Sequence, residues 1–153
     1  MYTEQLTQGL NFNTPIQPQQ LTVTATVNSG SVDLQYCRRA IFTFNMGAFG
    51  GTSPTCSAQA QIQSSADNAT WTNEANDSAL TISAQNTGLT KEIRAGMLTA
   101  GKRYARLQVV CTIGGTSPTI PVAGLAIGAE ADHKPASAKN DTITYPVANQ
   151  SAV

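Results

Sequence analysis

Charge is scarce in this sequence, and the shortage argues against a nucleic-acid-binding protein. Charged residues make up 12% of the 153 positions, about half of the share of roughly 25% found in average proteins. Nine basic residues balance nine acidic ones, so the chain lacks the basic surface by which proteins usually bind nucleic acid. We therefore expect no direct nucleic-acid partner.

The residue types that catalysis and metal binding need are also few. His133 is the single histidine, and the three cysteines, Cys37, Cys56 and Cys111, are spaced too widely for a CxxC metal site. The sequence contains no nucleophile elbow, HExxH pair or phosphate-binding loop. We expect no catalytic residue, no metal site and no cofactor.

A pair of acids is the remaining route to an enzyme, because glycoside hydrolysis requires only two carboxylates. The candidates are Asp67, Glu74 and Asp77, which lie near one predicted hairpin. Solvated loop acids are far commoner than catalytic pairs, so we expect that the chain is not an enzyme.

Long apolar segments are missing as well. No stretch approaches the roughly 20 apolar residues of a membrane span, and the N-terminal MYTEQLTQGLNF lacks the basic and apolar parts of a signal peptide. We expect no membrane partner and synthesis in a cytoplasm.

The sequence does contain apolar and polar residues that alternate with period two, which is typical of antiparallel strands with one solvated face. The alternating runs are residues 21–27, 40–46, 56–63, 80–84, 102–113 and 119–127, with a shorter one at 91–93. Their apolar phases predict a buried core of Phe42, Phe44, Ile62, Ile82, Leu107, Val109 and Ile113. Turn-forming residues separate the runs, and residues 94–99 suit one helical turn. The pattern predicts an all-β antiparallel sandwich.

The two ends differ from the middle, which divides the chain into an N-terminal arm (1–20), a sandwich domain (21–128) and a C-terminal arm (129–153). Neither arm has a strong period, but each holds spaced apolar residues, including Phe12 and Ile16 in front and Ile143, Tyr145 and Val147 behind. Two interpretations stay open: disordered tails, or arms that become ordered on a neighbouring subunit. The second predicts a homo-oligomer, a trimer or alternatively a dimer.

Basic residues gather in one part of the chain. Seven of the nine lie between positions 38 and 106, namely Arg38, Arg39, Lys91, Arg94, Lys102, Arg103 and Arg106. They suit either protection of strand edges and ends or contacts to an acidic partner surface. Trp71, the only tryptophan, follows a predicted turn at Asp67-Asn68. It suits packing on a hairpin or, alternatively, stacking against a sugar ring.

Four segments together resemble one known family. They are SVDL at 31–34 followed by Tyr36, AIFTFNMGAF at 40–49, AQIQSSADNATWT at 60–72, and the stretch from AGKRYARLQ to PVAGLAIG at 100–128. In order and spacing they resemble the cement, or decoration, proteins of tailed-phage heads, across residues 21–128 and most strongly at 101–115.

This resemblance implies a jelly-roll-like β-sandwich with extended terminal arms, made in the host cytoplasm and bound to the capsid exterior of the virion. It implies two partners, the major capsid protein and further copies of the chain itself. The candidate contact residues are Phe12, Ile16, Arg38, Arg39, Ile143 and Tyr145.

Two of the same pieces, SADNATWT at 65–72 and RYARL at 103–107, are similar to discoidin-type carbohydrate-binding jelly rolls. That similarity implies an alternative function, a carbohydrate-binding module on a virion or cell surface with Trp71 as its sugar platform. Members of that family are normally secreted and often carry a disulfide. This sequence predicts neither, so the cement function is our main hypothesis.

Overall fold

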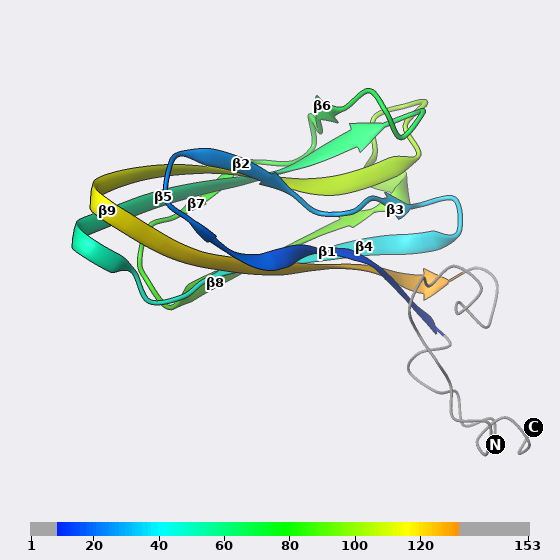
Figure 1. Ribbon diagram of the computed structural model, residues 1–153. Helices are drawn as coiled ribbons and strands as arrows, with labels where there is room; N and C mark the ends of the chain where they lie inside the picture. The colour runs from blue at the N-terminus through cyan, green and yellow to red at the C-terminus, as the bar shows by residue number, and fades with distance from the viewer. Residues whose placement is uncertain (1–8, 132–153) are drawn as a thin grey trace, which may run out of the picture.

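Two antiparallel sheets packed face to face form the part of the protein described by the computed structural model, residues 9–131 (Figure 1). This confirms the predicted all-β, jelly-roll-like sandwich. The elements are β1 (Leu10–Leu21), β2 (Ala25–Asn28), β3 (Val32–Asp33), β4 (Cys37–Met46), β5 (Gly50–Ser65), β6 (Thr72–Asn73), β7 (Leu80–Ile82), β8 (Thr87–Arg94), a 3₁₀ turn η1 (Ala95–Met97) and β9 (Tyr104–Ala131).

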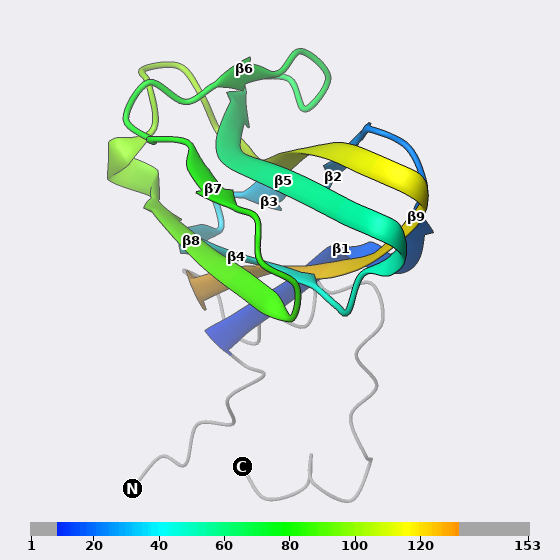
Figure 2. The same ribbon diagram turned by 90° about the vertical axis from the view of Figure 1, so that its left-hand side faces the viewer.

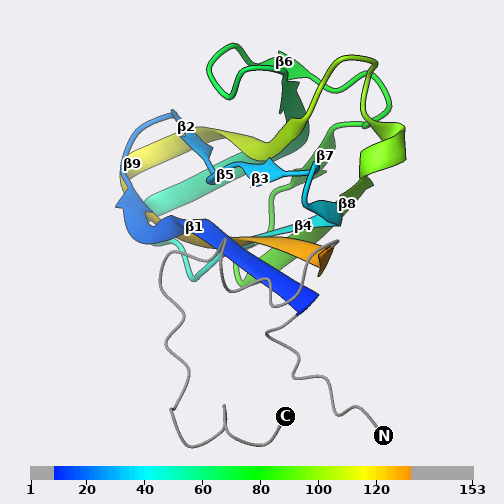
Figure 3. The same cartoon turned by 90° about the vertical axis from the view of Figure 1, so that its right-hand side faces the viewer.

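We name the two layers sheet A and sheet B. In sheet A the strand order is β1-β9-β4-β8. In sheet B, β2 and β3 pair with one side of β9, and β5 pairs with the other side and carries β6 and β7 beyond it. Figures 2 and 3 look along the sandwich from its two ends and show sheet B above sheet A.

Strand β9 belongs to both sheets. Its 28 residues begin beside β5 in sheet B and end beside β4 in sheet A, and Figure 1 shows the ribbon bending from one layer to the other. The sequence predicts two strands here, at 102–113 and 119–127. They form one continuous strand, because Gly114 and Gly115 make a corner between the sheets and not a reversing turn.

Glycine is required at that corner, where β5 and β9 bend together. Gly51 and Gly115 have φ angles of +106° and +110°, a conformation that side chains disfavour. A Cβ atom at Gly115 would lie 2.6 Å from the carbonyl oxygen of Ser53, and one at Gly51 would lie 2.5 Å from that of Ser117. The bends of β5 and β9 can therefore pack together only because Gly51 and Gly115 have no side chains.

The core lies between the sheets and largely follows the predicted phases. The five fully enclosed members of the predicted set are Phe42, Phe44, Ile62, Leu107 and Val109, each 0% exposed. The other two, Ile82 and Ile113, are only half-buried, so their predicted burial is wrong. Ile82 lies on a three-residue edge strand, and Ile113 directly precedes the corner. All three cysteines are buried, and none of them forms a disulfide.

One predicted strand is broken by the architecture. Residues 21–27 alternate continuously, but Leu21 pairs with Ile120 in sheet A, whereas Ala25 pairs with Cys111 in sheet B. The chain between them crosses from one sheet to the other. Val23 is consequently 68% exposed although its phase predicts burial.

Most of the predicted N-terminal arm is part of the sandwich. Residues 10–20 belong to β1, which pairs with β9, and Ile16 is 2% exposed within the core. The expectation that Ile16 contacts another subunit is therefore corrected: the chain's own sheets bury it. At the other end β9 continues to Ala131, past the predicted boundary at 128. Residues 1–8 and 132–153 lie outside the described part.

The predicted helical turn at 94–99 is present as η1. Within the described range, no helix is long and apolar enough to cross a membrane.

Candidate functional site

The outer face of sheet A carries a row of apolar side chains. They come from alternate positions of β9 and from the neighbouring β4, and we call them the outer apolar strip: Ile41, Pro121, Ala123, Leu125 and Ile127. Ile41 pairs with Ile127 across the two strands. Leu125 is 48% exposed, and the other four are half-buried.

Strand β9 is apolar on both of its faces along this stretch. The alternate set, Ile120, Val122 and Ala126, faces the core and is at most 3% exposed. A strand that is apolar on both faces is typical of sheets covered on both sides, yet among the described residues nothing covers the outer side of β9. The run IPVAGLAIG at 120–128 is the sequence signal for this strip, because apolar residues occupy both phases of the alternation there. The predicted strand at 119–127 accounts for only one of those phases.

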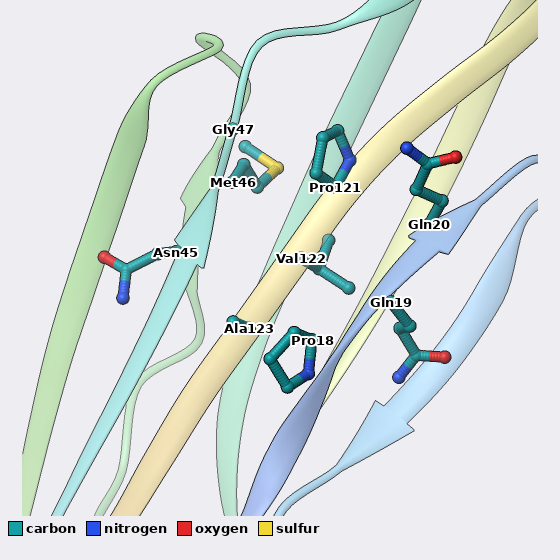
Figure 4. Close-up of a pocket in the computed structure, with 9 residues that line it drawn as sticks. All are labelled: Pro18, Gln19, Gln20, Asn45, Met46, Gly47, Pro121, Val122 and Ala123. Atoms are coloured by element: carbon teal, nitrogen blue, oxygen red, sulfur yellow. The ribbon is translucent and has the colours of Figure 1, made fainter.

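A groove lies at one end of the same face (Figure 4). It has a volume of about 610 Å³ and lies among β1, β4 and β9. Pro18, Pro121 and Ala123 supply its apolar lining, and the largely core-facing Met46 and Val122 border it. The register of β1 against β9 shifts on both sides of Ile16, so this end of β1 is paired less regularly with β9. Two groove residues, Pro121 and Ala123, also belong to the outer apolar strip.

The opposite end of the strip has a charged rim. Arg39 forms ion pairs with Glu92 at 3.1 Å and with Glu130 at 2.9 Å. Of the other predicted contact residues, Phe12 pairs with Ile127 across β1 and β9, and Arg38 is exposed next to Arg39. The predicted contacts Ile143 and Tyr145 lie outside the described residues.

The outer face of sheet B carries a different cluster, built around Trp71. The guanidinium carbon of Arg106 lies 4.4 Å from the centre of the Trp71 ring. Arg106 donates from Nε and Nη2 to Oε1 of Gln63, at 2.9 and 2.7 Å. Gln63 donates in turn to Oδ1 of Asn73 at 3.0 Å. We call these four residues the Trp71–Arg106 cluster.

Neutral amides continue this face next to the cluster. Asn28, Gln108 and Gln61 pair side by side across β2, β9 and β5, one row away from the pair Gln63 and Arg106. The two outer faces of the sandwich thus differ: sheet A carries an apolar strip with charged residues at one end, and sheet B carries mainly amides around Arg106, with the ion pair of Arg103 and Asp33 beyond them.

The acids considered for hydrolysis hold the fold together. Glu74 is 1% exposed and accepts the N–H and the O–H of Thr99. Burial by itself raises the pKa of Glu74, but hydrogen bonds, chiefly from Thr99, outweigh it and the pKa lies below its usual value. Asp77 pairs with the buried Lys91 at 2.8 Å and also accepts the N–H of Ile62.

Asp67 organises the turn before Trp71. Its carboxylate accepts the backbone N–H groups of Thr70 and Ala69, which hold its pKa far below the ordinary value, with help from Ser65. This confirms the predicted turn at Asp67-Asn68, where Asn68 has a positive φ.

Several of the basic residues also form ion pairs with acids of their own chain. Arg103 pairs with Asp33 and stacks against Tyr104, which fastens β3 to β9. Arg94 lies 3.9 Å from Glu92. Within residues 9–131 no three His, Cys, Asp or Glu side chains form a group able to hold a metal ion.

The sequence patterns point to Trp71 and Arg106 separately but do not place them together, and they give no sign of Gln63. Gln63 and Arg106 are 43 positions apart and meet only because β5 pairs with β9. No local spacing signals that pairing.

No protein-family model and no curated protein matches this chain. Among solved structures it is similar to the PBSX exported protein XepA, with a TM-score of 0.54 and 13% identity over 95% of this chain. The match covers 43% of XepA, so this chain spans less than half of that protein's length. The likeness shows a shared fold.

Looser similarities are to a CBM4 protein (TM-score 0.38, 11% identity, 68% of this chain and 60% of the other) and to a family 11 carbohydrate-binding module from Clostridium thermocellum (TM-score 0.34, 10% identity, 86% and 94%). At these scores neither likeness adds to the argument.

Proposed function

We propose that this protein is a structural virion protein, a decoration protein that binds the outside of a phage head through the outer face of sheet A. The observation that carries the proposal is the outer apolar strip. Exposing Leu125 and its neighbours to water costs free energy of about 25 cal/mol per Å² of apolar surface. Docking against another protein surface recovers that free energy.

The surroundings of the strip suit a protein partner. Leu125, near its centre, pairs with the uncharged Thr43. Ile41 pairs with Glu92 on its other side, so the Arg39 ion pairs form a charged rim beside Ile41. An apolar centre with a polar rim is the usual arrangement of protein interfaces. The partner we propose is the major capsid protein, in keeping with the resemblance of residues 21–128 to cement proteins.

Binding would stabilise the head by mass action. A protein that binds the assembled shell better than its free subunits shifts the equilibrium towards the shell, and more so as its free concentration exceeds its dissociation constant. Many symmetric copies multiply a modest contact. This role requires no catalytic group, which fits the structural work of Glu74, Asp77 and Asp67.

The experiment compares two exposed leucines on different sheets. Leu125 is 48% exposed and Leu80, on β7 in sheet B, is 44% exposed. We expect the wild type and Leu80→Asp to co-sediment in fixed stoichiometry with expanded heads that lack the protein, and Leu125→Asp to lose most of this binding. Both variants should keep the wild-type circular dichroism spectrum. Heads that bind Leu125→Asp as well as the wild type, or that do not bind the wild type, would overturn the proposal.

The alternative function, carbohydrate binding, is favoured by a separate observation: the half-buried Trp71 and its amide neighbours lie on the opposite sheet. A glycan array probed with the same variants separates the two functions. A carbohydrate-binding module should bind the array whether or not Leu125 is replaced, whereas a decoration protein alone should ignore it.

A further inference from the structure

Arg106 differs from Arg39, Arg94 and Arg103 in having no acid beside it. Each of those three arginines pairs with a carboxylate. Arg106 forms no ion pair with any residue of the described range, and Gln63 is its only hydrogen-bond acceptor there. Its Nη1 donates to no described residue. That edge of the guanidinium is therefore able to donate to an anion from outside, which would supply the counter-ion that the described residues do not.

The guanidinium is also held in place before any ligand arrives. Gln63 is 7% exposed, and its amide is fixed by Asn73, so its Oε1 is directed at Nε and Nη2 of Arg106. The Trp71 ring stacks on the same guanidinium at 4.4 Å. Burial lowers the pKa of Arg106, in line with a cation that has lost part of its hydration. A cation oriented in advance binds its ligand at a smaller entropic cost.

We propose that the Trp71–Arg106 cluster binds an anionic saccharide, with the free edge of Arg106 on the sugar carboxylate and the neighbouring amides on its hydroxyl groups. Guanidinium groups suit carboxylates because their N–H donors match the two oxygens. Asn28, Gln61 and Gln108 each offer both a donor and an acceptor, as a ring of hydroxyl groups requires. Trp71 adds an apolar surface beside the charge.

The neutral surroundings favour a saccharide over an acidic peptide or a nucleic acid. Polyanions are usually bound by several cations, each of which neutralises one charge. Here one arginine without a counter-ion stands among amides and hydroxyl groups on the outer face of β2, β5 and β9, and the nearby Arg103 is already paired with Asp33. That ratio suits a ligand with one carboxylate per several hydroxyl groups, as in a uronic or sialic acid. The site lies on the sheet opposite the outer apolar strip and does not depend on the proposed function.

The single tryptophan makes the site directly observable, because intrinsic tryptophan fluorescence reports on Trp71 alone. The probes are trigalacturonate and sialyllactose, each titrated beside its uncharged counterpart, the methyl ester of trigalacturonate and lactose. We expect at least one acidic saccharide to change the fluorescence saturably and to bind at least about tenfold more tightly than its neutral counterpart, as loss of a charged hydrogen bond implies. If neither acidic probe binds more tightly than its counterpart, the proposal is wrong.

Two arginine variants locate the effect. Arg106→Gln should weaken binding of the acidic probe at least about tenfold and leave binding of the neutral one unchanged. Arg94→Gln, which removes an exposed arginine elsewhere, should bind like the wild type. If both variants weakened binding of the acidic probe equally, the effect would come from the overall charge of the protein, and the proposed site would be wrong. Hexaglutamate serves as an acidic peptide probe. If it bound more tightly than either acidic saccharide, the ligand would be a peptide and the saccharide proposal would be wrong. The comparison of each acidic saccharide with its uncharged counterpart uses the wild-type protein, so it tests the proposal even if Arg106→Gln fails to fold.

Discussion

Glu74 is a buried carboxylate, and hydrogen bonds from the residues around it offset the free-energy cost of its burial. The N–H and O–H of Thr99 and the N–H of Asn76 all approach its carboxylate. Those bonds tie the loop after β6 to the segment that follows η1. A buried carboxylate is stable only when such donors replace its hydration, so this acid serves the fold.

The lowered pKa of Glu74 makes the stability of the protein depend on pH. A carboxylate whose pKa is lower in the folded state stabilises the fold above its unfolded pKa, about 4.3, and this contribution disappears as the pH falls through the folded value. We expect wild type to be more stable than Glu74→Gln at pH 7, and the difference to shrink as the pH is lowered below about 4. Urea denaturation across this range measures it. A difference that stays constant with pH would contradict the assignment.

Phe44 tests the strand phase that builds the core. It is 0% exposed on β4, so Phe44→Ala should lower the free energy of unfolding by about 3–5 kcal/mol, through lost burial and the cavity left behind. Val23→Ala is the control. That residue is 68% exposed in the crossing between sheets, and its replacement should change stability by less than about 0.5 kcal/mol. A loss under about 1 kcal/mol at Phe44 would refute the predicted phase.

Among the elements, β9 determines the architecture, because it is the strand that joins the two sheets. It pairs with β1, β2, β3, β4 and β5. Its bend at Gly114 and Gly115 brings the two halves of one strand onto opposite layers. The same bend gives β9 two different outer faces, polar at Arg106 and Gln108 and apolar at Leu125 and Ile127. Both proposed binding surfaces therefore depend on this corner.

Gly115 is the position where the corner is most easily tested. Gly115→Ala places a Cβ against the Ser53 carbonyl at a positive φ, and we expect a loss of about 1–3 kcal/mol. Gly96→Ala is the matched control, because nothing lies within 4 Å of its Cβ position. Thermal and urea unfolding of both variants make the comparison. Equal stabilities would mean that the bend adapts to a side chain.

In the whole molecule, the two proposed binding surfaces lie on opposite sides of the sandwich: the outer apolar strip on sheet A and the Trp71–Arg106 cluster on sheet B. Figure 2 shows sheet A and sheet B as separate layers. A head bound to the outer apolar strip of sheet A would leave the Trp71–Arg106 cluster on the side away from the shell. The two proposals are therefore compatible, and each can fail without the other.

The prediction that terminal arms link subunits requires truncations that respect β1. Removal of residues 1–18 would delete most of that strand, including the buried Ile16, and would test folding instead. Deletion of residues 1–8 and, separately, of 136–153 removes no residue of the described strands. We expect each variant to keep the wild-type circular dichroism spectrum and to have a smaller oligomeric mass by light scattering than the full chain, which we expect to be a trimer or alternatively a dimer. If both variants keep the full-length mass, the arms do not link subunits.

Features that depend on neighbouring residues could be predicted from the order of residues along the chain. Side chains alternate between the two faces of a strand, so the apolar phases of β4 and β5 and of the first half of β9 identified Phe42, Phe44, Ile62, Leu107 and Val109 as core. The turn at Asp67-Asn68 and the short η1 were likewise predictable, because turn chemistry is local.

Features that depend on distant pairing emerged only in the folded molecule. The alternation at 21–27 gives no sign that Leu21 joins sheet A and Ala25 joins sheet B, or that β9 passes through both. Burial of Ile16 required the partner strand β9, and the contact of Gln63 with Arg106 required the register of β5 against it. Such contacts are fixed by which strands lie side by side and how they bend, and period-two alternation carries information only about faces, not about partners.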